Sequence, residues 1–218
     1  MARLDPVLDE LVHRSFFGAY DVEPREGRPV ASLIVKGNCA TASSIMFRSS
    51  LREVVHPIPV EIPYGDWWLA TRAAQFAEIA CERSQRTMYR LHRENLTLGA
   101  RGEQEAREQR KFTIFRRHFL RYLRSGDMAP GEMLEVCEWV VDSARWVAAY
   151  LDVPWQELVP VSYDERRTAT ALAAQAREAA RSGKHGEAAA LYANALGHAL
   201  DSEATHEGMG ELRVVLAA

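Results

Sequence analysis

Pro63-Tyr64-Gly65-Asp66-Trp67-Trp68-Leu69 is the stretch around which the fold of this chain is organised. It sets one acid between a glycine and two tryptophans, at the start of an apolar segment. Apolar residues recur downstream at helical spacing, so the pattern predicts a helix from Trp67 to about Cys81. A strand is predicted at Thr87 to Leu91, and polar residues, including His92, follow it. An acid at a helix start followed by a polar strand end is more typical of a reaction site than of packing.

Composition describes an ordinary globular protein of 218 residues, 47% apolar and 26% charged. A formal charge of -3 gives no overall attraction to nucleic acid or anionic membrane, and no sequence-specific nucleic-acid motif is present. Cys39, Cys81 and Cys137 form no CxxC pair, so neither a disulfide framework nor a thiolate zinc site is indicated. The chain shows no basic and apolar leader and no run of about 18 apolar residues. We therefore expect a cytoplasmic protein.

The first half of the chain is predicted to be mixed α/β, because short apolar runs alternate with many prolines and glycines. Ser32 to Val35 is a short apolar element that ends at Gly37. Ala42 to Arg48 is a candidate strand, and Ser49 to Val55 is a helical turn that stops before Pro57. This region, residues 1–103, is expected to form the first domain.

The second half is predicted to be wholly helical, which makes the chain predominantly helical overall. Apolar residues at helical spacing predict helices at Glu105 to Arg124, Glu132 to Leu151, Glu165 to Arg181 and Glu187 to about Leu200. We expect a helical extension over 104–160 and a helical hairpin over 161–218.

Four motifs in order carry a resemblance to a known family. They are Gly37-Asn38, Ser43-Ser44-Ile45-Met46-Phe47-Arg48, Pro63 to Trp68, and Tyr89-Arg90-Leu91-His92 with Asn95 and Thr97. Together they resemble the acceptor-side half of family 2 glycosyltransferases, over roughly residues 10 to 100. That family has a GT-A fold and transfers a sugar from a nucleotide-sugar donor to an acceptor hydroxyl. The resemblance implies a partial GT-A-like α/β part followed by the all-α region.

The resemblance gives Asp66 the role of general base, which takes the proton from the acceptor hydroxyl. It places Tyr64, Trp67 and Trp68 at the substrate. A helix start holds a carboxylate independently of any family, and the tryptophans are able to desolvate it. The alternative is that Asp66 is a plain N-cap, since Asp before an apolar helix is a common cap.

On the donor side, the resemblance places His92 at a divalent metal (Mn²⁺ or Mg²⁺) and at the donor diphosphate. Arg90 would face that diphosphate, and Asn38, Ser43 and Ser44 would line the donor or acceptor site. Each has an alternative. His92 is equally compatible with a backbone-paired imidazole, Arg90 with a surface ion pair, and Asn38 with turn chemistry.

The sequence departs from the family in two respects. Family members often carry glycine after the strand-end histidine, where this chain has Arg93. The Asp-x-Asp motif that binds the metal in GT-A enzymes is absent, because the resemblance begins near His13, downstream of that motif. The expectation is a truncated or split enzyme that is inactive alone. It would need a complementing upstream polypeptide, or would assemble as a homodimer.

The helix predicted at Glu105 to Arg124 is strongly basic. It carries two acids, Glu105 and Glu108, against seven basic residues, an excess of five: Arg107, Arg110, Lys111, Arg116, Arg117, Arg121 and Arg124. Such a helix is able to dock at the inner face of an anionic membrane. The alternative is a solvated face.

The last two predicted helices carry Gly183, Ala188, Tyr192 and Ala195 at a spacing similar to a tetratricopeptide hairpin. A plain terminal bundle gives the same pattern. Two functions therefore follow from the sequence: a nucleotide-sugar-dependent transferase fragment, or a non-catalytic helical module for protein interaction.

Overall fold

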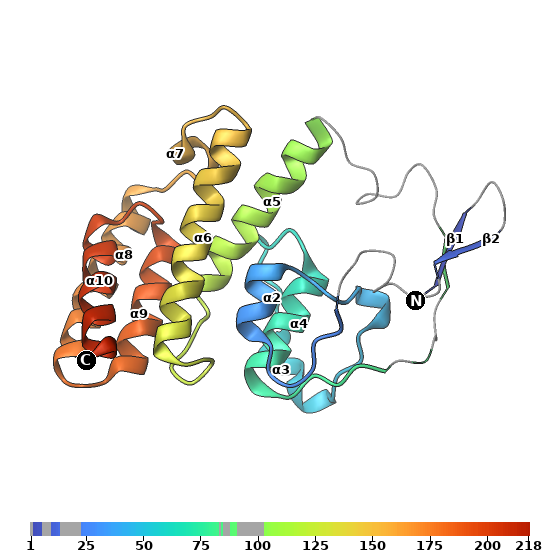
Figure 1. Cartoon of the computed structure of the whole chain (residues 1–218), viewed down its shortest axis with the longest axis horizontal. Coiled ribbons are helices and arrows are strands. Elements are labelled where there is room, and N and C mark those ends of the chain that lie inside the picture. The colour runs from blue at the N-terminus through green and yellow to red at the C-terminus, as the bar shows by residue number, and fades with distance from the viewer. Residues whose placement is uncertain (1, 6–9, 14–22, 83, 85–87, 91–102) are drawn as a thin grey trace. The chain divides into compact units, whose positions relative to one another are not determined.

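The computed structural model describes residues 2–5, 10–13, 23–82, 84, 88–90 and 103–218. The chain is predominantly helical and divides into two compact units (Figure 1). Unit 1 comprises Met1–Ile58 and Tyr64–Glu105, and unit 2 comprises Pro59–Pro63 and Ala106–Ala218. Unit 2 thus contains nearly all of the predicted ranges 104–160 and 161–218.

Unit 1 contains a small mixed sheet with strand order β2-β1-β3. Strand β1 (Ala2–Asp5) pairs antiparallel with β2 (Glu10–His13) and parallel with β3 (Met88–Arg90). The strand predicted at Thr87 to Leu91 is therefore confirmed in β3, whereas β1 and β2 were not predicted. A parallel pair needs a long crossover connection, and here that connection contains the helices of unit 1.

Among the described residues of unit 1, three helices precede β3: α2 (Val30–Lys36), α3 (Arg52–Val55) and α4 (Gly65–Phe76). Helix α4 packs against both α2 and α3. Its apolar face is alanine and tryptophan, and the buried apolar side chains of the three helices are Val30, Leu33, Ile34, Val55, Trp67, Trp68, Ala70, Ala73 and Ala74. The apolar element expected at Ser32 to Val35 is the core of α2.

Helix α4 is shorter than the predicted helix, which was to reach about Cys81. The backbone becomes extended at Ala77, and Ile79 forms an antiparallel bridge with Gly27, with N···O distances of 2.8 and 2.6 Å. Arg28 donates to the carbonyls of Ala74 and Gln75 in the last turn of α4. Helix α4 therefore ends where Gly27 and Arg28 form hydrogen bonds with its backbone and with the backbone that follows it.

The strand predicted at Ala42 to Arg48 is wrong. Residues Ala42–Ser44 form a 3-10 turn. The Thr41 amide donates to Ser44 Oγ at 3.0 Å, and that hydroxyl donates to the Thr41 carbonyl at 2.9 Å. Short polar side chains bonded to nearby backbone compete with a strand ladder. The helical turn predicted at Ser49 to Val55 is confirmed, as a 3-10 turn at Ser49–Leu51 that leads into α3.

Unit 2 is built from helices that follow one another along the chain. They are α5 (Glu103–Leu120), α6 (Pro130–Tyr150), α7 (Trp155–Leu158), α8 (Tyr163–Arg181), α9 (His185–His198) and α10 (Glu203–Ala217). The four long predicted helices are confirmed, and α10 is an additional one. Helices α8 and α9 pack closely, and α10 lies beside both as well as beside α6 (Figure 1).

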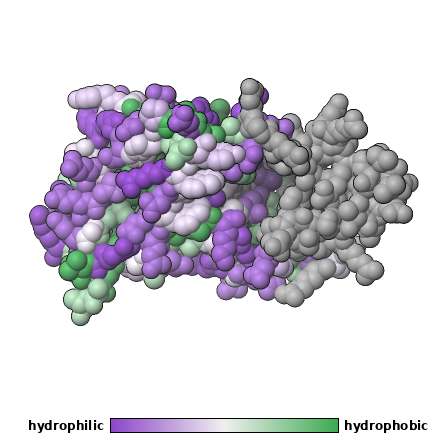
Figure 2. All heavy atoms as spheres, turned by 45° about the horizontal axis from the view of Figure 1, so that its top comes forward, coloured by the Kyte–Doolittle hydropathy of each residue, from purple (hydrophilic) through white to green (hydrophobic). Residues whose placement is uncertain are grey.

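Small residues allow the helices of unit 2 to approach one another. The face of α8 toward its neighbours consists of alanines that are almost fully buried: Ala169, Ala173, Ala176 and Ala179. Gly197 in α9 has no room for a side chain, since a Cβ there would lie 2.7 Å from the backbone nitrogen of Arg121. Gly183, with φ of 74°, lies in the short connection between α8 and α9. Hydrophilic side chains predominate on the face of the molecule shown in Figure 2.

Candidate functional site

Asp66 is the second residue of α4 and lies in its first turn. The N-cap position belongs to Tyr64, whose backbone is extended, so the alternative that Asp66 is itself the N-cap is wrong. Asp66 Oδ1 accepts a hydrogen bond from the Trp67 amide at 2.7 Å. That amide belongs to the first turn, whose N–H groups have no partner within the helix. A half-buried carboxylate here is favoured by the helix dipole.

Trp67 and Trp68 fix the start of α4 to the rest of unit 1. The Trp67 indole nitrogen donates to the Leu33 carbonyl of α2 at 2.8 Å, and the Trp68 indole nitrogen donates to the Val55 carbonyl of α3 at 2.9 Å. Both side chains are only 2% exposed. The tryptophan pair therefore anchors the helix that carries Asp66. Both rings are buried in the core of unit 1.

Tyr64 is the aromatic residue at this helix start that keeps contact with solvent. It is half-buried, and its ring centroid lies 6.1 Å from that of Trp67 at an interplanar angle of 46°. Among the residues predicted at the substrate, Tyr64 is thus the one with accessible surface beside Asp66.

The polar residues predicted after α2 are engaged in local bonds. Asn38 Nδ2 donates to the Ala40 carbonyl, and the Ala40 amide donates to Asn38 Oδ1 at 3.2 Å. Ser44 closes the 3-10 turn, and the exposed Ser43 hydroxyl lies 3.2 Å from Thr41 Oγ1. These bonds give Asn38 the turn role that was its alternative interpretation.

Arg90 and His92 are the residues predicted to contact the donor diphosphate, and neither side chain is described. Arg90 is the last residue of β3 and pairs with Leu4 of β1, but only its backbone is described. His92 lies outside the described residues, so its place at a divalent metal and at the donor diphosphate stays a prediction. Within the described ranges, no group of three or more His, Cys, Asp or Glu is placed to hold a metal ion.

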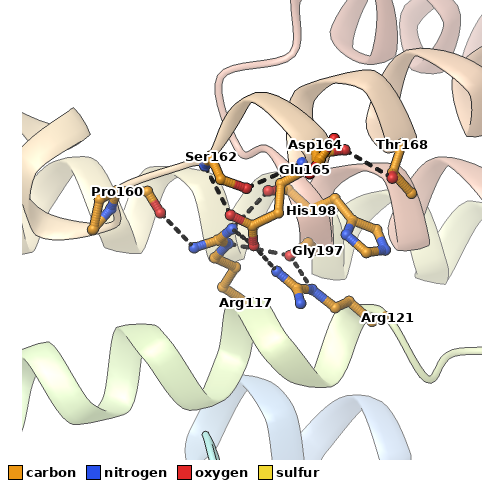
Figure 3. Close-up of polar contacts among 9 residues, drawn as sticks. All are labelled: Arg117, Arg121, Pro160, Ser162, Asp164, Glu165, Thr168, Gly197 and His198. Carbon is orange, nitrogen blue, oxygen red and sulfur yellow. Dashed lines mark hydrogen bonds and ion pairs between the residues drawn. The ribbon is translucent and has the colours of Figure 1, made fainter.

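A second polar cluster, in unit 2, was not predicted from the sequence (Figure 3). Arg117 of α5 is 4% exposed, and it donates to Glu165 of α8 at 2.7 Å. It also donates to the carbonyls of Pro160, Gly197 and His198, at 3.1, 3.1 and 2.6 Å. Two of these carbonyls end α9, where a cation is favourable.

Arg121, the residue that follows the end of α5, completes this cluster. It donates to the Gly197 carbonyl at 2.7 Å and pairs with the same Glu165 oxygen that Arg117 contacts. The other Glu165 oxygen accepts from the Ser162 amide at 2.9 Å, in a capping box at the start of α8. One carboxylate therefore joins the start of α8 to α5 and, through the arginines, to the end of α9.

Burial, hydrogen bonds and nearby charges shift the pKa values of several groups around this cluster. The pKa of Glu165 is lowered to about 2 by its hydrogen bonds to Ser162 and by the charges of Arg117 and Arg121, against an opposing effect of burial. The pKa of His118 is lowered to about 4, chiefly by burial and then by the same two arginines. Burial and Arg121 also lower the pKa of His198, so both imidazoles are neutral at pH 7.

The basic residues between 105 and 124 are directed inward in part, at Arg116, Arg117 and Arg121. Arg117 and Arg121 belong to the cluster just described, and Arg124 pairs with the buried Asp127 at 3.3 Å. Arg116 lies over the rings of Phe112 and Trp139, at 5.9 and 4.6 Å, and burial lowers its pKa to about 10. The exposed basic residues of this helix are Arg107, Arg110 and Lys111. Membrane contact through residues 105–124 stays a prediction. The exposed basic residues of that range are these three and Arg124, of which Lys111 pairs with Glu108 and Arg124 with Asp127.

No family model, no curated protein and no solved structure matches this chain. In the part of the chain that the structure describes, none of the helices combines the length and the apolar character that crossing a bilayer requires.

Proposed function

We propose that this chain carries the acceptor-side half of a nucleotide-sugar-dependent glycosyltransferase, on a GT-A-like α/β part, with Asp66 as the general base. The observation that supports this most directly is the fixed, half-buried position of Asp66 in the first turn of α4. A general base must be held within hydrogen-bond reach of the proton it takes. The two buried tryptophans provide that fixation, since each ties α4 to a different helix.

In the proposed reaction, Asp66 takes the proton of an acceptor hydroxyl while the hydroxyl oxygen attacks the anomeric carbon of the donor sugar. The new bond joins that oxygen to the anomeric carbon, and the bond from this carbon to the diphosphate oxygen breaks. The nucleoside diphosphate leaves with the electron pair. A single displacement of this kind inverts the configuration at the anomeric carbon. Tyr64 would contact the acceptor, because its ring is accessible beside Asp66.

The leaving diphosphate belongs to the donor side of the proposal, with Arg90 and His92 as its predicted contacts. A divalent cation, when bound, would neutralise the charge that develops there. The described residues do not form a site for such an ion by themselves. In this proposal, residues outside those described or a complementing polypeptide would bind the cation.

The test uses the full chain, coexpressed with the polypeptide encoded directly upstream, and a panel of UDP- and GDP-sugars with Mn²⁺ or Mg²⁺. The measurement is release of nucleoside diphosphate. Asp66→Asn should lower the rate by about 10²- to 10⁴-fold, the range for loss of a general base. Glu53→Gln is the matched control, because Glu53 is an exposed acid in the first turn of α3. Full activity in the Asp66→Asn variant would contradict the proposal that Asp66 is the general base.

The second candidate function is a non-catalytic helical interaction module. It is favoured by the α8–α9 hairpin, in which Ala188, Tyr192 and Ala195 are all at most 1% exposed and Gly183 makes the turn. Those are the four positions that resemble a tetratricopeptide hairpin. Donor binding separates the two functions, since a ligand of the folded state raises the thermal midpoint. Nucleotide sugars should leave the midpoint unchanged if the module function is correct.

A further inference from the structure

We propose that Trp146 and Tyr150 of α6 form a ledge that binds the pyranose rings of a neutral saccharide chain. The two rings lie one helical turn apart, with centroids 5.5 Å apart and planes inclined by only 8°. Trp146 is 60% exposed and Tyr150 is 51% exposed. This stack differs sharply from the buried tryptophans of α4, because its aromatic surface lies in water.

The ledge is rigid because the opposite face of α6 is packed into unit 2. Ala144, Val147 and Ala148 flank the two aromatic residues in sequence and are at most 3% exposed. Stacking further restricts the two rings before any ligand arrives. A preordered surface loses little conformational entropy on binding, which favours recognition by a weakly interacting ligand.

Asp142, one helical turn before Trp146, forms an exposed ion pair with Arg145, and this pair is called the rim of the ledge. Asp142 and Arg145 lie 3.6 Å apart, with side chains 74% and 57% exposed. The guanidinium of Arg145 also lies 5.7 Å from the ring of Trp155. The rim is therefore neutral in sum, and it offers both a hydrogen-bond acceptor and a set of donors beside the rings.

A sugar ring matches this combination of groups. Oxygen substituents polarise the C–H bonds of a pyranose, and these bonds meet the negative face of an aromatic ring favourably, as a cation does more strongly. Sugar hydroxyls both donate and accept, so they are able to bond to Asp142 and Arg145 together. The proposed function supplies the class of ligand, since a glycosyltransferase needs a hydroxyl acceptor. No fixed distance from Asp66 is required.

Other ligands fit this surface less well. The core of a protein–protein interface is depleted of charged residues, whereas here an exposed acid and an exposed arginine precede Trp146 on the same helix. Single-stranded nucleic acid also stacks on aromatic residues, but it needs a positive groove along its phosphates. The rim offers Arg145 together with the opposing charge of Asp142.

The experiment titrates the full chain with maltohexaose, cellohexaose and chitohexaose, each followed by isothermal calorimetry. At least one of these saccharides should bind saturably below about 10 mM, in the weak range of affinities. Trp146→Ala and Tyr150→Ala should each weaken that binding about tenfold or more. Tyr163→Ala is the control, because Tyr163 is 79% exposed on a different helix, and it should leave binding unchanged.

Saccharide binding at the ledge and sugar transfer at Asp66 are tested independently of each other. Asp66→Asn should bind the saccharide as the unaltered chain does, so saccharide binding that depends on Trp146 supports the ledge whether or not sugar transfer is found. Absence of saturable binding to all three saccharides would overturn the ledge, as would equal binding by Trp146→Ala. A shift from dimer to monomer in Trp146→Ala, measured by sedimentation velocity, would also overturn it, because a second copy would then cover the rings.

Discussion

The phenol of Tyr192 in α9 lies directly against Gly208 in α10. A Cβ at position 208 would be 2.3 Å from the phenolic oxygen and 2.6 Å from the ring carbon that carries it. Tyr192 is 1% exposed and fills the space between these helices. The contact therefore sets how closely α10 approaches α9.

Gly208→Ala should destabilise unit 2 by about 1–3 kcal/mol, the cost of forcing extra volume into a packed contact. Gly210→Ala is the control in the same helix, since nothing lies within 4 Å of a Cβ there. The control should stabilise the helix by up to about 1 kcal/mol, because alanine is the better helix former. Urea unfolding followed by circular dichroism measures both changes, and equal stabilisation by the two variants would contradict the contact.

Glu165 and Arg117 should be coupled in a double-mutant cycle. Glu165→Gln removes the charge partner of an arginine that is 4% exposed, and it should cost about 1–3 kcal/mol of unfolding free energy. Arg117→Met in that background should cost less than it does alone, because the uncompensated charge has already been created. Glu178→Gln, at a side chain 74% exposed on the same helix, should stay within about 0.5 kcal/mol. Additive costs in the cycle would exclude the coupling.

Acid should destabilise unit 2 in two successive ranges of pH. The folded-state pKa of His118 is about 4, below its ordinary 6.5, so the unfolded chain takes up the proton first and stability falls as pH drops from 6.5 toward 4. The folded-state pKa of Glu165 is about 2, below its ordinary 4.5, so its contribution is complete above pH 4.5 and is lost toward pH 2.

Urea unfolding at pH 7, 5.5 and 4.5 measures the first range. His118→Gln should flatten the pH dependence between 6.5 and 4, with His198 accounting for part of what remains. His185→Gln serves as the comparison, at the first residue of α9. If His118→Gln and the unaltered chain show the same slope, His118 does not govern this range.

Trp67→Phe should destabilise unit 1 by about 1–3 kcal/mol, because the Leu33 carbonyl loses the donor that satisfies it in a buried place. Trp146→Phe removes an indole nitrogen from a ring that is 60% exposed, and it should change stability by less than about 0.5 kcal/mol. Thermal unfolding of both variants gives the comparison. A Trp67→Phe variant as stable as the original chain would show that this bond does not anchor α4.

The helices of unit 2 could be predicted from the sequence because their signal is local. Apolar periodicity placed a helix at Glu132 to Leu151, and α6 occupies Pro130–Tyr150. Strands β1 and β2 were missed, since each is four residues long and β1 depends on a partner far along the chain. The false strand at Ala42 to Arg48 arose because side-chain bonds at Thr41 and Ser44 were not anticipated.

The candidate site was predicted in part. The helix start at Asp66 was identified, but the place of Asp66 within the first turn depends on where the backbone of Tyr64 becomes extended. The cluster around Arg117 and Arg121 was missed, because a basic helix predicts a solvated face. Gly197 reverses that expectation, since its missing side chain lets the end carbonyls of α9 reach both arginines.

The parallel pairing of β1 with β3 has a consequence for synthesis on the ribosome. Strand β1 is translated before its partner Met88–Arg90, which emerges only after helices α2, α3 and α4. The α8–α9 hairpin, by contrast, closes as soon as its second helix leaves the exit tunnel, because its partners are neighbours in sequence. The nascent amino-terminal segment must therefore remain protected from aggregation for longer than the helical carboxyl-terminal segment.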